Sequence, residues 1–319
     1  MLIGEVHPMA VGRTGGTAAP AREEAAVTAP ASPRLLELLR LAEEQPALDR
    51  LAPYLADGAP EVRRTAVSVL TESAPAGTGA ALAAALGDPD AEVRSAAVAG
   101  LRELVEVLDG SIGPALGAAA GSPDPVVRAG VLELARVLRT GTAGLFAAGL
   151  ADPAVPVRLQ AVHGLVSLRD AGLLAAAAGD TAREIRVAVG EGLGTVGDPA
   201  AEADLLRLAG DADPLVRAAA FEGAAGVGCP PALAALAAVP DDAWQVRKGA
   251  ARALGAAGAL EPLLALLADS HMDVRKAAVR ALAPHAAAAP VRTALRDRLA
   301  DPDADVRAYA RLALKRPGG

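Results

Sequence analysis

The sequence is poor in the residues that carry most covalent and metal chemistry. Its 319 residues include one cysteine, Cys229, and four histidines, and aromatic side chains make up only 2%. A single cysteine excludes an intrachain disulfide framework and a cysteine-based metal site. Few aromatics leave little on which bases or flat ligands could stack. These shortages argue against a disulfide-stapled domain and against a base-stacking protein.

Long apolar runs and an excess of positive charge are missing as well. No stretch approaches the roughly 18 apolar residues of a membrane span, and residues 1–33 lack the basic start and continuous apolar core of a signal peptide. The net charge of -7 disfavours nucleic acid as a partner, because binding to it relies on Lys and Arg that neutralise phosphates. We therefore expect a cytoplasmic protein without a membrane segment.

The sequence does contain one turn that is repeated nine times. The plainest copy, DPDAEVR, occupies residues 88–94. Its arginine recurs at intervals of 28 to 34 residues, and eight of the nine copies have an acid six positions before it. The pairs of positions are Asp57 and Arg63, Asp88 and Arg94, Ser122 and Arg128, Asp152 and Arg158, Asp180 and Arg186, Asp211 and Arg217, Asp241 and Arg247, Asp269 and Arg275, and Asp301 and Arg307. A fixed pattern at this period indicates stacked supersecondary units.

Each turn carries the signals of a helix start. Aspartates stand at the expected N-cap, and several copies place proline at the first helical position. The N-caps are Asp90, Asp124, Asp213 and Asp303, and the prolines are Pro60, Pro125 and Pro214. We expect each arginine to pair with the aspartate of its own or a neighbouring turn, which would form a ladder along the stack. Alanine at Asp152 or Asp211 in mid-stack should then cost more stability than at Asp301, because interior units have two neighbours.

The remaining segments are interpreted around this array. Residues 1–33 have no periodicity and are expected to be a disordered leader. Residues 34–45 are strongly apolar and are expected to form an N-terminal capping helix of a solenoid over residues 34–316, with residues 317–319 as a tail. The 34-residue interval predicts that the helix after Arg94 continues to Asp109, before Gly110.

The pattern Asp-Pro-Asp-x-x-Val-Arg-x-Ala-Ala-x-x-x-Leu, complete at residues 88–101 and nearly so at 301–314, resembles the HEAT repeat. The likeness is strongest to the short bacterial form found in phycobilisome-lyase-like proteins, and it covers roughly residues 46–316. It implies an all-α fold, a right-handed α–α superhelix of about nine helical hairpins, with the helix after Val-Arg on the concave surface. HEAT proteins include scaffolds, bilin-attachment proteins, iron-dependent hydroxylases and DNA alkyl-base glycosylases, so the fold alone selects no function.

The chemistries of these relatives are not apparent in the sequence. Iron hydroxylases of the family carry His-Glu pairs, and none of the four histidines is followed by Glu. His271 lies in a repeat turn and is interpreted as a surface residue. Trp244 lies three residues before Arg247, where it is expected to pack over a repeat junction, and Cys229 is interpreted as a structural thiol. We assign no catalytic residue, metal or cofactor.

One row of side chains should line the concave surface. The residue five positions after each anchor arginine points away from the apolar helix face, so these residues lie in line on successive units. They are Ser68, Ala99, Glu133, His163, Glu191, Glu222, Arg252, Arg280 and Leu312, with Lys248 and Lys276 one turn earlier on their helices. The row changes sign between Glu222 and Arg252. It is either an exposed face without a ligand or a bipolar groove.

Three functions remain open. The leading hypothesis is a non-enzymatic scaffold that binds a protein partner with Glu133, His163, Glu191, Glu222, Lys248, Arg252, Lys276 and Arg280. The first alternative is a lyase-like enzyme or other factor that handles a small ligand in the groove. The second is a glycosylase-like DNA-binding protein that uses the basic patch formed by Lys248, Arg252, Lys276 and Arg280.

Overall fold

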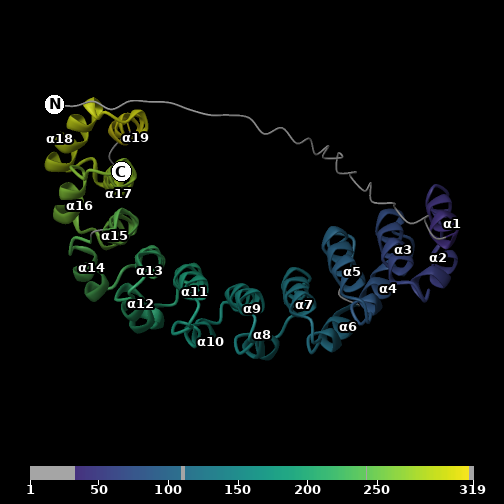
Figure 1. Ribbon diagram of the computed structural model, residues 1–319. Helices are drawn as coiled ribbons and strands as arrows, with labels where there is room; N and C mark the ends of the chain where they lie inside the picture. The colour runs from purple at the N-terminus through teal and green to yellow at the C-terminus, as the bar shows by residue number, and fades with distance from the viewer. Residues whose placement is uncertain (1–32, 109–111, 242, 316–319) are drawn as a thin grey trace, which may run out of the picture.

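The computed structural model describes residues 33–108, 112–241 and 243–315, and these ranges are helical without a strand. The helices alternate along the chain between the inner and the outer side of an arc, as Figure 1 shows. The predicted all-α repeat architecture is confirmed, whereas the handedness of the superhelix stays a prediction. No helix in the described ranges combines the length and the apolar character needed to cross a membrane.

The helices that follow the repeated turn form the inner side of the arc (Figure 1). These inner helices are α3 (Pro60–Ser73), α5 (Ala91–Glu103), α7 (Pro125–Val137), α9 (Val155–Leu168), α11 (Arg183–Val196), α13 (Pro214–Gly226), α15 (Trp244–Ala257), α17 (Met272–Leu282) and α19 (Ala304–Lys315). The predicted aspartate caps are present. Asp90, for example, accepts hydrogen bonds from the backbone N–H groups of Glu92 and Val93 at 2.9 and 3.1 Å.

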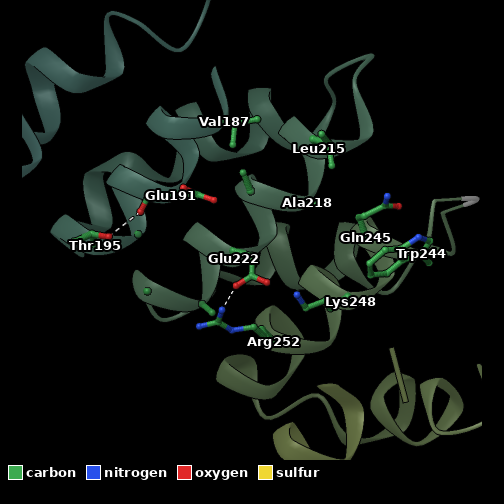
Figure 2. A pocket seen from close by; sticks show the side chains of 14 residues that line it. Val187, Glu191, Thr195, Leu215, Ala218, Glu222, Trp244, Gln245, Lys248 and Arg252 are labelled. Atoms are coloured by element: carbon green, nitrogen blue, oxygen red, sulfur yellow. Dashed lines mark hydrogen bonds and ion pairs between the residues drawn. The ribbon is translucent and has the colours of Figure 1, made fainter. Parts of the chain in front are cut away.

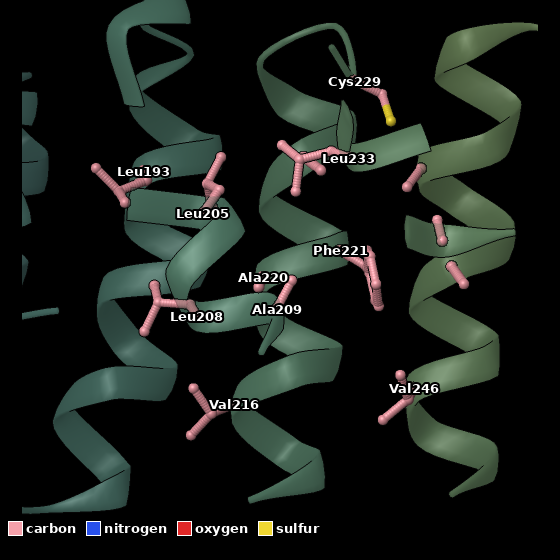
Figure 3. Packing of buried hydrophobic residues seen from close by; sticks show 14 of the residues in the cluster. Leu193, Leu205, Leu208, Ala209, Val216, Ala220, Phe221, Cys229, Leu233 and Val246 are labelled. Atoms are coloured by element: carbon pink, nitrogen blue, oxygen red, sulfur yellow. The ribbon is translucent and has the colours of Figure 1, made fainter. Parts of the chain in front are cut away.

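Shorter helices form the outer side of the arc. They are α2 (Leu48–Leu55), α4 (Thr78–Ala85), α6 (Gly113–Ala119), α8 (Ala143–Gly149), α10 (Ala171–Ala175), α12 (Glu202–Ala209), α14 (Pro231–Ala237), α16 (Leu260–Leu266) and α18 (Ala289–Asp297). Leucines of these helices meet those of the inner helices in an elongated core, part of which Figure 3 shows around Leu205, Leu208 and Phe221. Cys229 is buried in it, and burial raises the pKa of its thiol, which fits a structural residue.

Two segments bear on the predicted boundaries. Helix α1 (Pro33–Ala42) packs against α3 and buries Leu38 and Leu41. The predicted leader, residues 1–33, lies outside the described residues except for Pro33, which begins α1, and the predicted tail, residues 317–319, lies outside them entirely. The predicted extension of α5 to Asp109 is wrong, since α5 ends at Glu103 and turns follow. Leu108 follows these turns and lies against Gly79, so its apolar character reflects packing and not continuation of the helix.

Eight of the nine anchor arginines, from Arg63 to Arg275, bind an aspartate of the following repeat, which confirms the predicted ladder. Arg186 donates from Nε and Nη2 to the two carboxylate oxygens of Asp211 at 2.7 and 3.1 Å, while its Nη1 donates to the backbone oxygen of Asp180 at 2.8 Å. Asp211 also accepts from the N–H of Asp213 at 2.8 Å. The pairs are Arg63–Asp88, Arg94–Asp124, Arg128–Asp152, Arg158–Asp180, Arg186–Asp211, Arg217–Asp241, Arg247–Asp269 and Arg275–Asp301.

The ladder has two features that the turn pattern did not indicate. Arg34 on α1 donates to Asp57 at 3.1 Å, so α1 supplies the first arginine although no Val precedes it. In the third repeat Ser122 replaces the usual aspartate, and the N-cap residue Asp124 takes its place by accepting from Arg94 at 2.7 and 3.0 Å. Both donors of Arg94 reach the same oxygen of Asp124, because the other oxygen caps α7. The N-cap thus compensates for the missing acid.

Acid is expected to destabilise the stack by protonating this ladder. The pKa of Asp152 and of Asp211 lies below its ordinary value, chiefly because Arg128 or Arg186 donates hydrogen bonds to the charged carboxylate, while burial opposes the shift. Since the folded pKa is the lower one, this stability is complete above the unfolded value of about 3.9 and is lost as pH falls through the folded pKa. The melting temperature should stay level from about pH 6 to 5 and drop below about pH 4. A level melting temperature throughout this range would contradict a stabilising ladder.

Small residues allow the inner helices to approach each other closely. A Cβ atom added at Gly223 of α13 would lie 2.3 Å from the backbone oxygen of Gly190 on α11, and one added at Gly226 would lie 2.1 Å from that of Gly194. Such contacts are possible only without side chains. This close spacing of the inner helices fits the bending of the stack toward them in Figure 1.

Candidate binding groove on the concave face

The predicted row lies on the inner helices, along the concave side of the arc. Glu133 and Glu222 are partly buried, and His163, Glu191, Arg252 and Arg280 are exposed. The spacing of the repeat therefore brings these residues onto successive inner helices. Their surroundings differ from one repeat to the next, and the ion pairs between them decide which charges are free to meet a ligand.

Two carboxylates of the row are already paired. Glu133 accepts from Arg102 of the preceding inner helix, at 2.7 Å from Nε and 2.6 Å from Nη2. Glu222 on α13 and Arg252 on α15 form an ion pair at the point where the row changes sign. The change of sign is thus bridged within the protein. Arg252 nevertheless keeps 60% of its side chain exposed, so it can still contact a ligand.

Lys276 belongs to a structural cluster. Its Nζ lies 3.1 Å from Asp305, 3.5 Å from Asp273 and 3.6 Å from Asp303. A hydrogen bond to Asp305 is the main reason that the pKa of Lys276 is raised, with the charges of the other two carboxylates adding to the effect and burial opposing it. Lys276 therefore ties α17 to α19, and its charge is largely neutralised by this protein's own acids.

His163 lies among charges of both signs. Although His163 is exposed as a residue, neighbouring atoms shield part of its ring from water and lower the pKa of the imidazole. The charge of Arg136 lowers this pKa further, whereas Glu191 and Glu133 act in the opposite direction. The net effect favours the neutral ring near pH 7, because the ordinary histidine pKa is already about 6.5. His163 thus contributes a neutral polar group to the row.

Three charges of the row and its neighbours have no ion pair among the described residues. They are Glu191 on α11, Lys248 on α15 and Arg280 on α17, and the guanidinium of Arg280 lies 5.5 Å from the ring of Tyr309 on α19. Figure 2 shows Glu191 and Lys248 on opposite sides of Ala218 and Glu222 of α13. A charged group of a partner could reach each of them without displacing an existing salt bridge.

A hollow of about 750 Å³ lies over α11, α13 and α15 and contains two of these charges. Its apolar lining includes Val187, Leu215 and Trp244, and its polar lining includes Glu191 and Lys248 (Figure 2). The floor is formed partly by Gly194, Ala218, Ala219 and Gly226, the small residues of the close helix contacts. Their small size opens the surface at this point, and larger residues surround it.

Trp244 forms the wall of this hollow nearest the repeat turns. It begins α15, and its ring stacks on that of His271 with centroids 4.0 Å apart and planes 6° apart. His271 is itself the N-cap of α17, because its Nδ1 accepts from the N–H of Asp273 at 3.2 Å. The expected packing of Trp244 over a repeat junction is confirmed. The sequence analysis did not include Trp244 among the lining residues. The single tryptophan of the chain, placed at the start of a helix, could have indicated it.

A second hollow of about 650 Å³ continues the first toward the C-terminal end of the stack. The two share Ala225, Lys248 and Arg252, so they adjoin along α15. The second is lined by Arg280, Tyr309 and Pro284 from the following helices. We call the two hollows together the concave groove. Among the predicted site residues, Glu191, Glu222, Lys248, Arg252, Lys276 and Arg280 line it, whereas Glu133 on α7 and His163 on α9 are not part of its lining.

Comparison with known proteins identifies the family of the chain. A family model described as HEAT repeats matches residues 48–135, 171–255 and 233–315. The chain belongs to the HEAT-repeat family. No curated protein matches it. YibA from Escherichia coli, of known structure, is 14% identical with a TM-score of 0.53 over 90% of this chain and 98% of that chain. An engineered protein of known structure is 21% identical with a TM-score of 0.49 over 88% and 95% of the two chains.

These similarities concern the HEAT fold alone. The match with YibA supports a stack of helical pairs and says nothing about a ligand. In this HEAT-repeat protein the described residues contain no group of three or more His, Cys, Asp or Glu side chains that could hold a metal ion. The polar groups of the concave groove instead present separate charges across neighbouring repeats, an arrangement that suits an extended ligand with several charged groups.

Proposed function

We propose that this HEAT-repeat protein is a scaffold that binds a segment of a partner protein in the concave groove. The observation that carries the proposal is the pair of adjoining hollows over α11 to α19, whose unpaired charges Glu191, Lys248 and Arg280 stand beside an apolar wall. Both hollows are open to solvent along the inner helices. Small-molecule sites usually enclose most of their ligand, whereas a long open groove suits a polypeptide.

The charges of the groove define the chemistry of the segment. Glu191 would pair with a basic residue at one end of the partner segment, and Lys248 and Arg280 would pair with acidic residues at its other end. Val187, Leu215 and Trp244 between and beside them call for an apolar anchor, the kind of contact that dominates many interfaces. The proposed partner segment is therefore bipolar, with an apolar residue in the part that occupies the first hollow.

Charge reversal in the groove is expected to weaken binding without unfolding the protein. Lys248→Glu places a carboxylate where the partner is expected to present one, and like-charge contacts across an interface can cost several kcal/mol. Affinity should fall by about tenfold or more, while the melting temperature changes little because Lys248 is exposed. Glu191→Lys should act in the same way at the other end.

The partner can be obtained by photo-crosslinking from position 245, because Gln245 lines the first hollow. Affinity of the purified partner is then measured for each variant by calorimetry. Glu261→Lys and Arg296→Glu, both exposed on outer helices, are the matched controls. If the groove variants bind as tightly as the parent protein, the groove is a solvent-exposed face and the proposal is wrong.

A further inference from the structure

The second hollow of the concave groove is lined by an excess of positive charge. Its charged lining consists of one carboxylate, that of Asp273, and four cations, which are Lys248, Arg252, Lys276 and Arg280. Asp273 lies 3.5 Å from the Nζ of Lys276, so a cation of the same lining already engages this carboxylate. Lys248 and Arg280 are exposed and have no ion pair among the residues that the structure describes. Two positive charges in this hollow are therefore left uncompensated.

The two uncompensated cations stand on neighbouring helices, Lys248 on α15 and Arg280 on α17. The guanidinium of Arg280 lies over the ring of Tyr309, 5.5 Å from its centroid. Such a contact engages the flat face of the guanidinium and leaves the N–H groups at its edge for an acceptor. Arg252, one turn after Lys248 on α15 (Figure 2), keeps 60% of its side chain exposed although it is bound to Glu222. The hollow thus offers ammonium and guanidinium donors from two helices.

We propose that the second hollow binds the phosphate group of a phosphorylated serine or threonine in the partner segment. The inference rests on the proposed function, because the segment bound in the concave groove carries this phosphate. A phosphorylated side chain has about 1.5 to 2 negative charges at pH 7 and three acceptor oxygens. It can therefore balance both Lys248 and Arg280, and it suits the planar fork of an arginine. A single carboxylate would leave one of these two cations unbalanced.

A nucleic acid fits this hollow less well. Its phosphates follow one another along a backbone, so its binding relies on a continuous track of cations. Here the excess of positive charge is confined to α15 and α17. On one side the first hollow presents Glu191 and Glu222, and on the other side Asp305 of α19 keeps 69% of its side chain exposed. A backbone that extends in either direction would meet carboxylates, whereas one phosphorylated residue would not.

The test uses three pools of degenerate peptides that differ only at one fixed central residue, which is phosphoserine, glutamate or serine. The helices from α11 to α17 span roughly 24–30 Å, which an extended chain of eight or nine residues covers, so peptides of about twelve residues suffice. Their retention on the immobilised full chain is measured by quantitative mass spectrometry. The phosphoserine pool should be retained about tenfold more strongly than the glutamate pool.

Variants of the hollow show whether the retained phosphate lies there. Arg280→Gln and Lys248→Gln should each lower retention of the phosphoserine pool about tenfold, because each removes one of the two uncompensated charges. Both side chains are exposed, so circular dichroism should show intact helices. Arg296→Gln, at an exposed position of the outer helix α18, is the matched control and should retain the pool like the parent protein.

The other outcomes separate this inference from the proposed function. Equal retention of the phosphoserine and glutamate pools would overturn the inference and leave the scaffold function standing, since carboxylates would then suffice. Retention of no pool, or full retention by Arg280→Gln and Lys248→Gln, would also overturn it, while crosslinking from position 245 would still test the scaffold.

Two competitors complete the test. Inorganic phosphate alone should bind more weakly than the phosphoserine peptides by about tenfold or more, because it makes no contact with the first hollow. Equal binding would assign the hollow to free phosphate and overturn the inference. A DNA duplex that binds more tightly than the peptides, and loses affinity in Arg280→Gln, would overturn it in favour of a nucleic-acid site.

Discussion

Asp301→Ala is expected to cost about 3–5 kcal/mol of stability, the usual loss when one partner of a buried ion pair is removed. Arg275 and Asp301 are the most buried pair of the ladder, with side chains 10% and 0% exposed. The substitution would leave the guanidinium of Arg275 buried without its carboxylate, and it would remove the hydrogen bond to the N–H of Asp303. Hydrogen exchange should show α18 and α19 losing protection before the rest of the stack, because each repeat depends on its neighbours.

Asp241→Ala is the matched control, since Arg217 and Asp241 are 22% and 20% exposed. This pair is closer to water, so its loss should cost about 1–2 kcal/mol, within the range for a single hydrogen-bonded partner. Position along the stack predicts the reverse order, with the interior aspartates mattering most. A larger loss at Asp241 than at Asp301, in urea unfolding followed by circular dichroism, would show that position outweighs burial.

Gly226→Ala is expected to cost about 3 kcal/mol, at the upper end of losses from overpacking. The new Cβ atom would lie 2.1 Å from the backbone oxygen of Gly194 and 2.8 Å from its Cα. A backbone cannot swing aside as a side chain can, so α11 and α13 must separate. Both glycines line the concave groove, and the separation should therefore also change its shape and weaken partner binding.

Gly117→Ala in α6 is the control for this prediction, because no atom lies within 4 Å of the added Cβ. Alanine there should leave stability unchanged or raise it by about 0.5–1 kcal/mol, since it reduces the freedom of the unfolded chain. Urea unfolding measures both variants. Equal stability of the two would mean that α11 and α13 have room to spare and that glycine is not required between them.

The parts of the fold that depend on neighbouring residues were predictable. Asp90 caps its helix through amides two and three residues away, so a short motif contains the whole interaction. The ladder was predicted as a class of contact, but its direction was not, because Arg186 lies 25 residues from Asp211 and only the stacking of repeats brings them together. The continuation of α5 was predicted wrongly. Leu104 and Leu108 follow the helical spacing of apolar residues, but they pack against the core after the helix has ended.

The candidate site shows the same division. Glu191, Glu222 and Arg252 occupy the same position in successive repeats, so the sequence alone predicts that they lie on one face of the stack. The pairing of Glu222 with Arg252 and the engagement of Lys276 by three aspartates did not, since they depend on the spacing between neighbouring helices. The place of Trp244 in the lining of the groove also depends on a contact between repeats, because its ring stacks on His271 of the next repeat.

The sequence by itself determined the HEAT-like period, the starts of the inner helices and the face on which the charged row lies, because each follows from chemistry repeated within about 30 residues. Only the tertiary structure decided which charges remain open to a partner. Whether a carboxylate is free or paired depends on distances of a few Å between side chains of different repeats, and these are set by the packing of Gly194, Gly226 and their neighbours.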